Sequence, residues 1–344
     1  MIHIQQLLIA SLFSGLACGC SSNEEKGGGA TNPPLADKVW YTNPVINIDT
    51  PDPSLIRTAT GTFYLYGTGG NTSVYKSDDL VHWDYVGYAY PEELKPAWEP
   101  GAGIWASDIN FINGQYVLYY SLSVWGGGNT CGIGVSTGSD PAGPFTDQGK
   151  LFRSNEIGVH NSIDPCYVED EGVKYLFWGS FFGLYATELT DDGLALKDPT
   201  AKTEIAGNAY EGAMVMKRGE YYYLFASIGS CCEGLNSTYT TVVGRSTNVL
   251  GPYVNKAGER MLDNKHEVII HKNDTFVGTG HNSEIVTDDA GKDWILYHAY
   301  QTANPDANRG VLLDRLYWTA DGWPYVLGDS PAVKAEAPAI ITHK

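Results

Sequence analysis

The sequence is poor in basic residues. Its 344 residues include 22 Lys and Arg against 40 Asp and Glu, which gives a formal net charge of −18 at pH 7. Without a basic stripe to neutralise phosphates, nucleic acid is not expected as a partner. The same balance disfavours a polyanionic polysaccharide, so a neutral ligand fits better.

Long helical periodicity is also nearly absent. Short alternating runs, rich in aromatic residues and separated by Gly, Asn and Asp, fill the chain and predict an all-β fold. The 23 Tyr, 9 Trp and 10 Phe suit stacking on sugar rings. The alternative is that aromatic residues are simply common in β-sheets.

No Cys-x-x-Cys pair with metal spacing occurs, so a zinc site is not expected. Four cysteines lie in the body of the chain: Cys131, Cys166, Cys231 and Cys232. In an oxidising compartment the adjacent pair could bond to each other or to the others. Buried free thiols are an equally good interpretation.

The N-terminal apolar run, Leu7 to Ala17, is too short to span a bilayer as a mature helix. A small residue followed by Cys resembles a bacterial lipoprotein cleavage site, and Cys20 is favoured over Cys18 because Gly19 precedes it. The polar, acidic stretch after Cys20 resembles the surface-export signal of some Gram-negative lipoproteins. Residues 1–6 lack the usual positive charge, and an ordinary secretory signal is the alternative.

These features divide the chain into three parts. We expect a signal peptide at 1–20, a flexible tether rich in Gly and Pro at 21–38, and one folded domain at 39–344. The expected location is the outer membrane, at the cell surface of a Gram-negative bacterium, with the lipid as the sole membrane attachment. A secreted or periplasmic protein is the alternative.

An aromatic strand pattern recurs five times along the chain. The five copies begin at Phe63, Tyr116, Tyr175, Tyr222 and Trp294. Their spacing and the turn signals between them suit four-stranded blades with variable loops. We therefore predict a five-bladed β-propeller. A two-sheet sandwich is the alternative, and five near-equal repeats count against it.

Each repeat carries one polar residue shortly before its aromatic strand. These residues are Asp52, Asp108, Asp164, Glu211 and His281. In a propeller, equivalent strand ends meet at one end of the axis, so these groups should converge there. Crowded carboxylates have pKa values that separate, which supplies the acid and the base of glycoside hydrolysis. Asp108 fits the register worst, and a structural hydrogen bond explains it equally well.

Several ordered motifs resemble glycoside hydrolase family 43, and within it the endo-acting α-1,5-L-arabinanases. The matching stretches are Thr50-Pro51-Asp52-Pro53-Ser54, Ile104-Trp105-Ala106-Ser107-Asp108-Ile109, Ser162-Ile163-Asp164-Pro165, Phe177-Trp178-Gly179-Ser180-Phe181, Tyr210-Glu211-Gly212, Cys231-Cys232-Glu233-Gly234-Leu235-Asn236-Ser237-Thr238-Tyr239, Gly280-His281-Asn282-Ser283 and Asp321-Gly322-Trp323-Pro324. The Cys-Cys run points most strongly to the arabinanase branch. Ser107, where the family usually has Pro, and Pro51, where His is common, depart from the pattern.

The resemblance implies an inverting mechanism. Asp52 would be the general base, Glu211 the general acid, and Asp164 the group that raises the pKa of the acid and orients it. His281 would bind a mostly hydrated calcium ion near the axis. A hydrogen-bonded channel histidine is the alternative, because calcium prefers oxygen ligands. His298, inside the fifth aromatic strand, is expected to be packed.

Substrate contacts are expected from Trp105, Ser180, Phe181, Asn161 and Asp108. The aromatic pair would stack on sugars, as Phe182 could, although packing inside a blade is at least as good an explanation for Phe182. Ser180 would hydrogen-bond a sugar hydroxyl, or serve only as a turn hydroxyl.

The sequence thus predicts a monomeric enzyme that cleaves internal α-1,5 linkages of arabinan and arabino-oligosaccharides. An exo-acting α-L-arabinofuranosidase or β-xylosidase on the same scaffold is the first alternative. A non-catalytic glycan-binding lipoprotein and a protein-interaction platform are the others.

Overall fold

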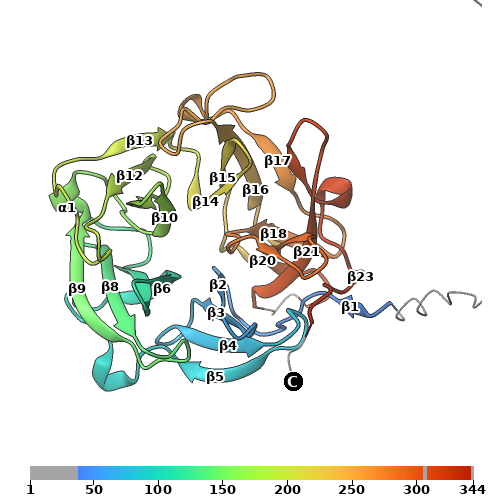
Figure 1. Cartoon of the computed structure of the whole chain (residues 1–344), viewed down its shortest axis with the longest axis horizontal. Coiled ribbons are helices and arrows are strands. Elements are labelled where there is room, and N and C mark those ends of the chain that lie inside the picture. The colour runs from blue at the N-terminus through green and yellow to red at the C-terminus, as the bar shows by residue number, and fades with distance from the viewer. Residues whose placement is uncertain (1–37, 305–307, 342–344) are drawn as a thin grey trace, which may run out of the picture. The chain divides into compact units, whose positions relative to one another are not determined.

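The computed structural model describes residues 38–304 and 308–341, and the predicted signal peptide and Cys20 lie outside these ranges. Within them, five antiparallel sheets surround a central axis (Figure 1). The predicted five-bladed β-propeller is confirmed. Among the described residues, no helix has the length and apolar character needed to cross a membrane.

The blades follow one another in chain order, and in each the chain runs from the axis outwards. Blade 1 comprises β2 (Ser54–Arg57), β3 (Phe63–Gly67), β4 (Ser73–Ser77) and β5 (Asp84–Tyr88). Blade 2 comprises β6 (Gly103–Ile112), β7 (Gln115–Ser123), β8 (Gly132–Gly138) and β9 (Thr146–Arg153). Blade 3 comprises β10 (Cys166–Asp170), β11 (Val173–Trp178), β12 (Leu184–Glu188) and β13 (Thr203–Ala206).

Blade 4 comprises β14 (Glu211–Arg218), β15 (Tyr221–Ile228), β16 (Thr240–Ser246) and β17 (Glu267–Ile270). Blade 5 comprises β18 (Phe276–Gly280), β20 (Asp293–Gln301), β21 (Gly310–Trp318) and β22 (Pro324–Tyr325), with β19 (Val286–Thr287) paired to β20. The connections hold only short helices: α1 (Ser154–Ile157), η1 (Glu92–Leu94), η2 (Gly234–Asn236), η3 (Met261–Asp263) and η4 (Leu327–Asp329).

The five aromatic repeats form the second strand of each blade. Alternating side chains of β3, β7, β11, β15 and β20 point to opposite faces of each sheet, and most of them are buried. The described core divides into five clusters, each filled from two neighbouring blades. Each blade therefore depends on both neighbours for its hydrophobic burial.

The two ends of the described chain meet at the edge of the propeller, beside blade 5 (Figure 1). There β1 (Trp40–Thr42) pairs antiparallel with β23 (Lys334–Glu336). The buried Asn43 amide donates to the carbonyls of Leu313 and Ala332, both at 2.9 Å, and accepts from Leu313 N–H at 2.9 Å. These bonds tie the segment before blade 1 to the last blade.

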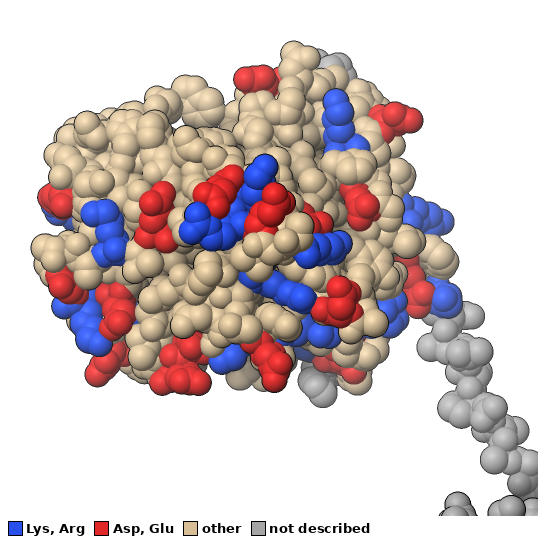
Figure 2. All heavy atoms as spheres, turned by 90° about the horizontal axis from the view of Figure 1, so that it is seen from above, with Lys and Arg blue, Asp and Glu red and all other residues tan. Residues whose placement is uncertain are grey.

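The surface carries both signs of charge. On the face shown in Figure 2, acidic and basic side chains are interspersed among uncharged ones. Elsewhere in the described ranges as well as on this face, charges of opposite sign form ion pairs; two examples are Lys197–Glu188 and Lys217–Asp170. That face therefore offers no continuous basic surface for a polyanion.

Candidate active site

A ring of left-handed backbone positions surrounds one end of the axis, one in each blade. Asp52, Ala106, Asp164, Gly212 and His281 have φ between 45° and 59°. Non-glycine residues rarely adopt this conformation, so four such residues in equivalent places mark a structural requirement. Blade 2 supplies Ala106 to the ring, which explains why Asp108 fitted the sequence register poorly.

Four of the five ring residues donate their backbone N–H to a side chain from the second strand of the preceding blade, or just after it. The acceptors are His298 Nδ1 for Asp52 at 3.1 Å, Thr68 Oγ1 for Ala106 at 2.9 Å, Ser121 Oγ for Asp164 at 2.9 Å and Ser227 Oγ for His281 at 2.8 Å. Four of the five blades thus position the ring residue of the next blade.

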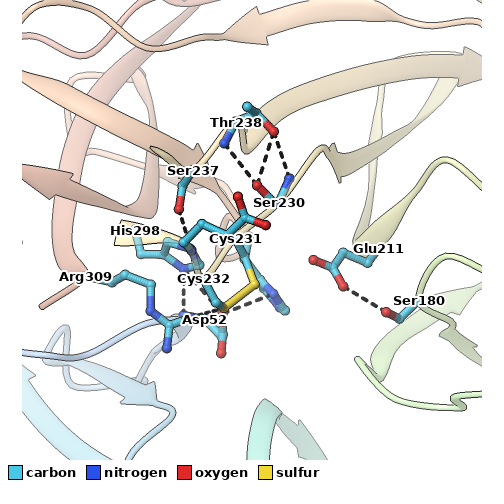
Figure 3. Close-up of a disulfide and its surroundings, with 12 residues drawn as sticks. Asp52, Ser180, Glu211, Ser230, Cys231, Cys232, Ser237, Thr238, His298 and Arg309 are labelled. Atoms are coloured by element: carbon cyan, nitrogen blue, oxygen red, sulfur yellow. Dashed lines mark hydrogen bonds and ion pairs between the residues drawn. A yellow bond between two sulfur atoms is a disulfide. The ribbon is translucent and has the colours of Figure 1, made fainter. Parts of the chain in front are cut away.

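The ring opens into a pocket of about 480 Å³. Predicted site residues that line it are Asp52, Trp105, Asn161, Asp164, Ser180, Phe181, Phe182, Glu211 and His281. Residues from different blades, distant in sequence, are therefore brought together in one cavity. Figure 3 shows Asp52 and Glu211 on opposite sides of it.

Asp52 is held as a carboxylate. Its Oδ1 lies 3.3 Å from Nδ1 of both His281 and His298. Burial alone would raise its pKa, but His281, His298 and Arg309 outweigh burial and hold the pKa well below the usual range. Burial lowers the pKa of both imidazoles.

Glu211 has the opposite character. Its side chain is buried at the start of β14, and its Oε2 accepts a 2.8 Å hydrogen bond from the Ser180 hydroxyl. Asn161 Nδ2 donates to Ser180 Oγ at 3.1 Å, which fixes that hydroxyl. Burial, together with the charge of Asp52, raises the pKa of Glu211 to about 7, although the Ser180 bond acts against the shift. Glu211 therefore keeps a proton at weakly acidic pH.

Asp164 lies beside Glu211 and is almost completely buried. Its Oδ2 accepts the N–H of Gly212 at 3.1 Å, which holds the backbone next to Glu211. Burial, and then the charges of Glu211 and Asp52, raise its pKa well above the usual range. Asp164 can thus orient the acid and interact with it electrostatically.

Aromatic side chains form the walls of the pocket. Trp105 comes from β6, and Phe181 and Phe182 follow β11. Phe181 is 37% exposed and Phe182 51% exposed, so both present ring surface to solvent. The His160 ring packs edge-on against Phe182, with centroids 4.4 Å apart. Phe182 thus belongs to the pocket wall and is not buried inside a blade.

His281 and His298 lie side by side at the axis. His298 is fully buried, as expected, and its Nδ1 lies 3.1 Å from the backbone nitrogen of Asp52. His281 is neutral at pH 7 because burial lowers its pKa, and a neutral imidazole can bind a metal. Residues 38–304 and 308–341 contain no cluster of three or more His, Cys, Asp or Glu suited to a metal. A cation at His281 would therefore keep mostly water ligands.

Asp108 lies away from the pocket lining. Its buried Oδ2 accepts the N–H of Tyr167 and the amide of Asn110, each at 2.7 Å. Burial, followed by Glu284, raises its pKa well above the usual range. Glu284 in turn accepts from the Ser54 hydroxyl at 2.8 Å. These contacts match the structural alternative for Asp108 and give no support to a substrate contact.

Some pocket residues were missed by sequence reasoning. Arg309, Trp125 and Tyr239 line the cavity, and Trp125 is 79% exposed at its rim. Trp125 follows the second aromatic strand, as Phe181 follows the third. This equivalent position could have predicted Trp125 as a pocket residue. Arg309 precedes β21 in a loop with no repeat pattern, so no signal marked it.

Residues 41–324 match the sequence profile of the glycosyl hydrolases of family 43. The chain belongs to this family.

Family 43 relatives cover most of the chain. An extracellular exo-α-(1→5)-L-arabinofuranosidase of Cellvibrio japonicus is 36% identical over 81% of this chain and 86% of its own. An extracellular endo-α-(1→5)-L-arabinanase of Bacillus subtilis is 34% identical over 79% and 86%. A solved structure, the Cellvibrio cellulosa α-L-arabinanase with arabinohexaose, superposes with a TM-score of 0.73 at 34% identity, over 81% of this chain and 96% of its own. Fold and family thus agree, and the chain is a glycoside hydrolase.

Proposed function

We propose that this family 43 protein is an inverting endo-arabinanase that cleaves internal α-1,5-L-arabinofuranosyl linkages. The observation that carries the proposal is the contrast between two carboxyl groups of one pocket. Asp52 has a strongly lowered pKa, whereas the pKa of Glu211 is raised to about 7. An ionised base and a protonated acid are what inverting hydrolysis requires.

In this mechanism Asp52 takes a proton from a water molecule, whose oxygen attacks the anomeric carbon. Glu211 gives its proton to the glycosidic oxygen as the bond from that oxygen to the anomeric carbon breaks. Asp164 holds the backbone beside Glu211 through Gly212 and keeps the acid in position. Water enters opposite the leaving group, so the anomeric configuration inverts.

The substrate follows from the neutral, aromatic walls and from the relatives. Trp105, Phe181 and Trp125 offer ring faces to uncharged sugars. The named relatives act on α-1,5-linked arabinose chains, one internally and one from an end. Because an exo-acting relative is 36% identical, exo-arabinofuranosidase activity is the second candidate.

Digestion of linear arabinan separates these candidates. A ladder of oligosaccharides supports endo action, and release of a single small product from the start supports exo action. NMR of the first product reports its anomeric configuration, and retention would contradict inversion. No hydrolysis of linear or branched arabinan would overturn the proposal.

Variants test the assigned roles. We expect Glu211→Gln and Asp52→Asn each to lower kcat by roughly 10²–10⁴-fold while leaving the fold intact. Circular dichroism checks the fold. Near-normal turnover by either variant would remove that residue from the mechanism.

We also propose a calcium ion at His281, with water in the remaining positions. The ion would add positive charge beside Asp52; every proton transfer described above is made by side chains of this chain. Calcium titration of chelator-treated protein, followed by thermal unfolding, tests binding without activity. A midpoint that does not move for wild type would contradict the site, and His281→Ala is the control.

For location, we propose a monomer anchored through a lipid on Cys20. The two relatives named above are called extracellular, which agrees with a place outside the cytoplasm. Radiolabelled palmitate should enter the wild-type protein in its host, and Cys20→Ser should abolish this. Persistent labelling of that variant with loss in Cys18→Ser would move the lipid to Cys18.

A further inference from the structure

Two adjacent cysteines form part of the pocket wall. Cys231 and Cys232 are joined to each other by a disulfide, and both line the same cavity as Asp52 and Glu211. Both are partly exposed, whereas the other two cysteines in the described ranges, Cys131 and Cys166, are buried free thiols. The only disulfide in the described part of the chain therefore lies where the sugar must pass.

The loop that carries the disulfide is tightly fixed. Ser230 N–H donates to Thr238 Oγ1 at 3.0 Å, and Glu233 N–H donates to the Ser237 hydroxyl at 2.9 Å. Tyr239 N–H donates a hydrogen bond to the Ser230 carbonyl at 3.0 Å. These bonds bring the two ends of the loop together and hold the disulfide at the cavity (Figure 3).

The disulfide lies on the side of the pocket where Asp52 is found. Arg309 Nη1 donates to Cys232 Sγ at 3.3 Å, and the Arg309 charge also acts on Asp52. Glu211 and Ser180 face it from the other side (Figure 3). If Asp52 acts as the base, it faces the anomeric carbon through the attacking water, and the sugar whose bond is cleaved would then lie next to the disulfide.

We propose that the Cys231–Cys232 disulfide is a sugar-binding surface that holds the reacting arabinose against the general base. This inference rests on the proposed arabinanase function. Sulfur is polarizable and apolar, so it can pack against the C–H groups of a sugar ring. A disulfide between neighbours has few rotatable bonds, and binding against it therefore costs little conformational entropy.

The double substitution Cys231→Ser/Cys232→Ser removes the disulfide and makes the surface polar. With arabinotriose to arabinohexaose as substrates, we expect KM to rise roughly 3–10-fold at every chain length, with kcat within about twofold of wild type. Equal effects at all lengths follow because every productive complex fills the reacting position. Cys231→Ala/Cys232→Ala keeps an apolar surface and should raise KM less.

Leu235→Ser is the matched control. Leu235 is an apolar residue of the same loop, 38% exposed, and does not line the pocket. Its KM should equal that of wild type. As a measurement without turnover, the serine pair combined with Glu211→Gln should weaken arabinohexaose binding by the same factor in calorimetry.

Three results would overturn the inference. Unchanged KM and binding in the serine variant would show that the sugar does not use this surface. Equal loss in the alanine and serine variants, with a lower unfolding temperature and lower kcat, would show a purely structural crosslink. Failure of the wild-type enzyme to cleave any arabinan would remove the proposed function, and this inference with it.

Discussion

At the residue scale, the two carboxyl groups proposed to act in hydrolysis differ through their neighbours. Asp52 faces two imidazole nitrogens at 3.3 Å and a nearby guanidinium. Glu211 is buried, and its carboxyl accepts a hydrogen bond from the Ser180 hydroxyl. The same chemical group therefore serves as a base in one place and as an acid in the other.

Ser180 provides a test of this difference. Its hydrogen bond lowers the pKa of Glu211, so Ser180→Ala should raise that pKa further. Since Glu211 must be protonated to act, kcat/KM of wild type should fall as pH rises through about 7, and the variant's fall should occur at higher pH. Ser180→Thr retains the hydroxyl and should keep the wild-type profile. A shift to lower pH in Ser180→Ala would contradict the assignment.

Glu211 should also destabilise the folded protein at neutral pH, because folding raises its pKa. Its pKa rises from 4.5 in the unfolded chain to about 7 in the fold. A raised folded-state pKa means that its contribution is fully present below pH 4.5 and is lost as pH increases through 7. The loss amounts to at most ~3 kcal/mol.

Glu211→Gln should remove this pH dependence. We expect the variant to gain stability relative to wild type between pH 4.5 and 7, in urea titrations at several pH values. A constant difference between the two proteins across that range would argue against the raised pKa.

At the element scale, the repeated aromatic strand could be predicted from the sequence, and most of the fold followed from it. Aromatic alternation predicted the second strand of every blade, and counting back from it found Asp52, Asp164, Glu211 and His281. Asp108 was misplaced because β6 has an irregular register between Trp105 and Asp108, which no local pattern announces. Arg309 was not predicted because it lies in a loop outside the repeat pattern, and only the three-dimensional fold brings that loop to the pocket.

The hydrogen-bonded contact of Asn43 with the last blade, here called the joint between the two ends of the described chain, provides a test at this scale. Asn43 makes three hydrogen bonds from a buried position, and Asn43→Ala removes all three. The buried Leu313 N–H then loses its Asn43 partner, whereas the Leu313 carbonyl keeps the bond from the Tyr41 hydroxyl. We expect a loss of roughly 2–4 kcal/mol in the free energy of unfolding, measured by urea denaturation. Lys38→Ala breaks only the exposed Lys38–Glu336 pair and should change little. Equal effects of the two changes would contradict the importance of this joint.

At the scale of the whole molecule, the five shared core clusters make the propeller one cooperative unit. Phe177 is fully buried in the cluster between blades 3 and 4. Phe177→Ala should lower the stability by about 3–5 kcal/mol. Because neighbouring blades share each cluster, circular dichroism and tryptophan fluorescence should report one coincident transition in wild type and variant. Two separate transitions would show that the blades unfold independently.

The ring of left-handed residues has one further consequence. Ala106 has the same backbone geometry and the same hydrogen bond to the blade before it as Asp52, Asp164 and His281, yet it presents only a methyl group. The same backbone conformation thus occurs with Asp, His and Ala side chains. Because the Ala106 methyl group is buried, a fourth chemical group could be introduced at this ring position only together with smaller side chains around it.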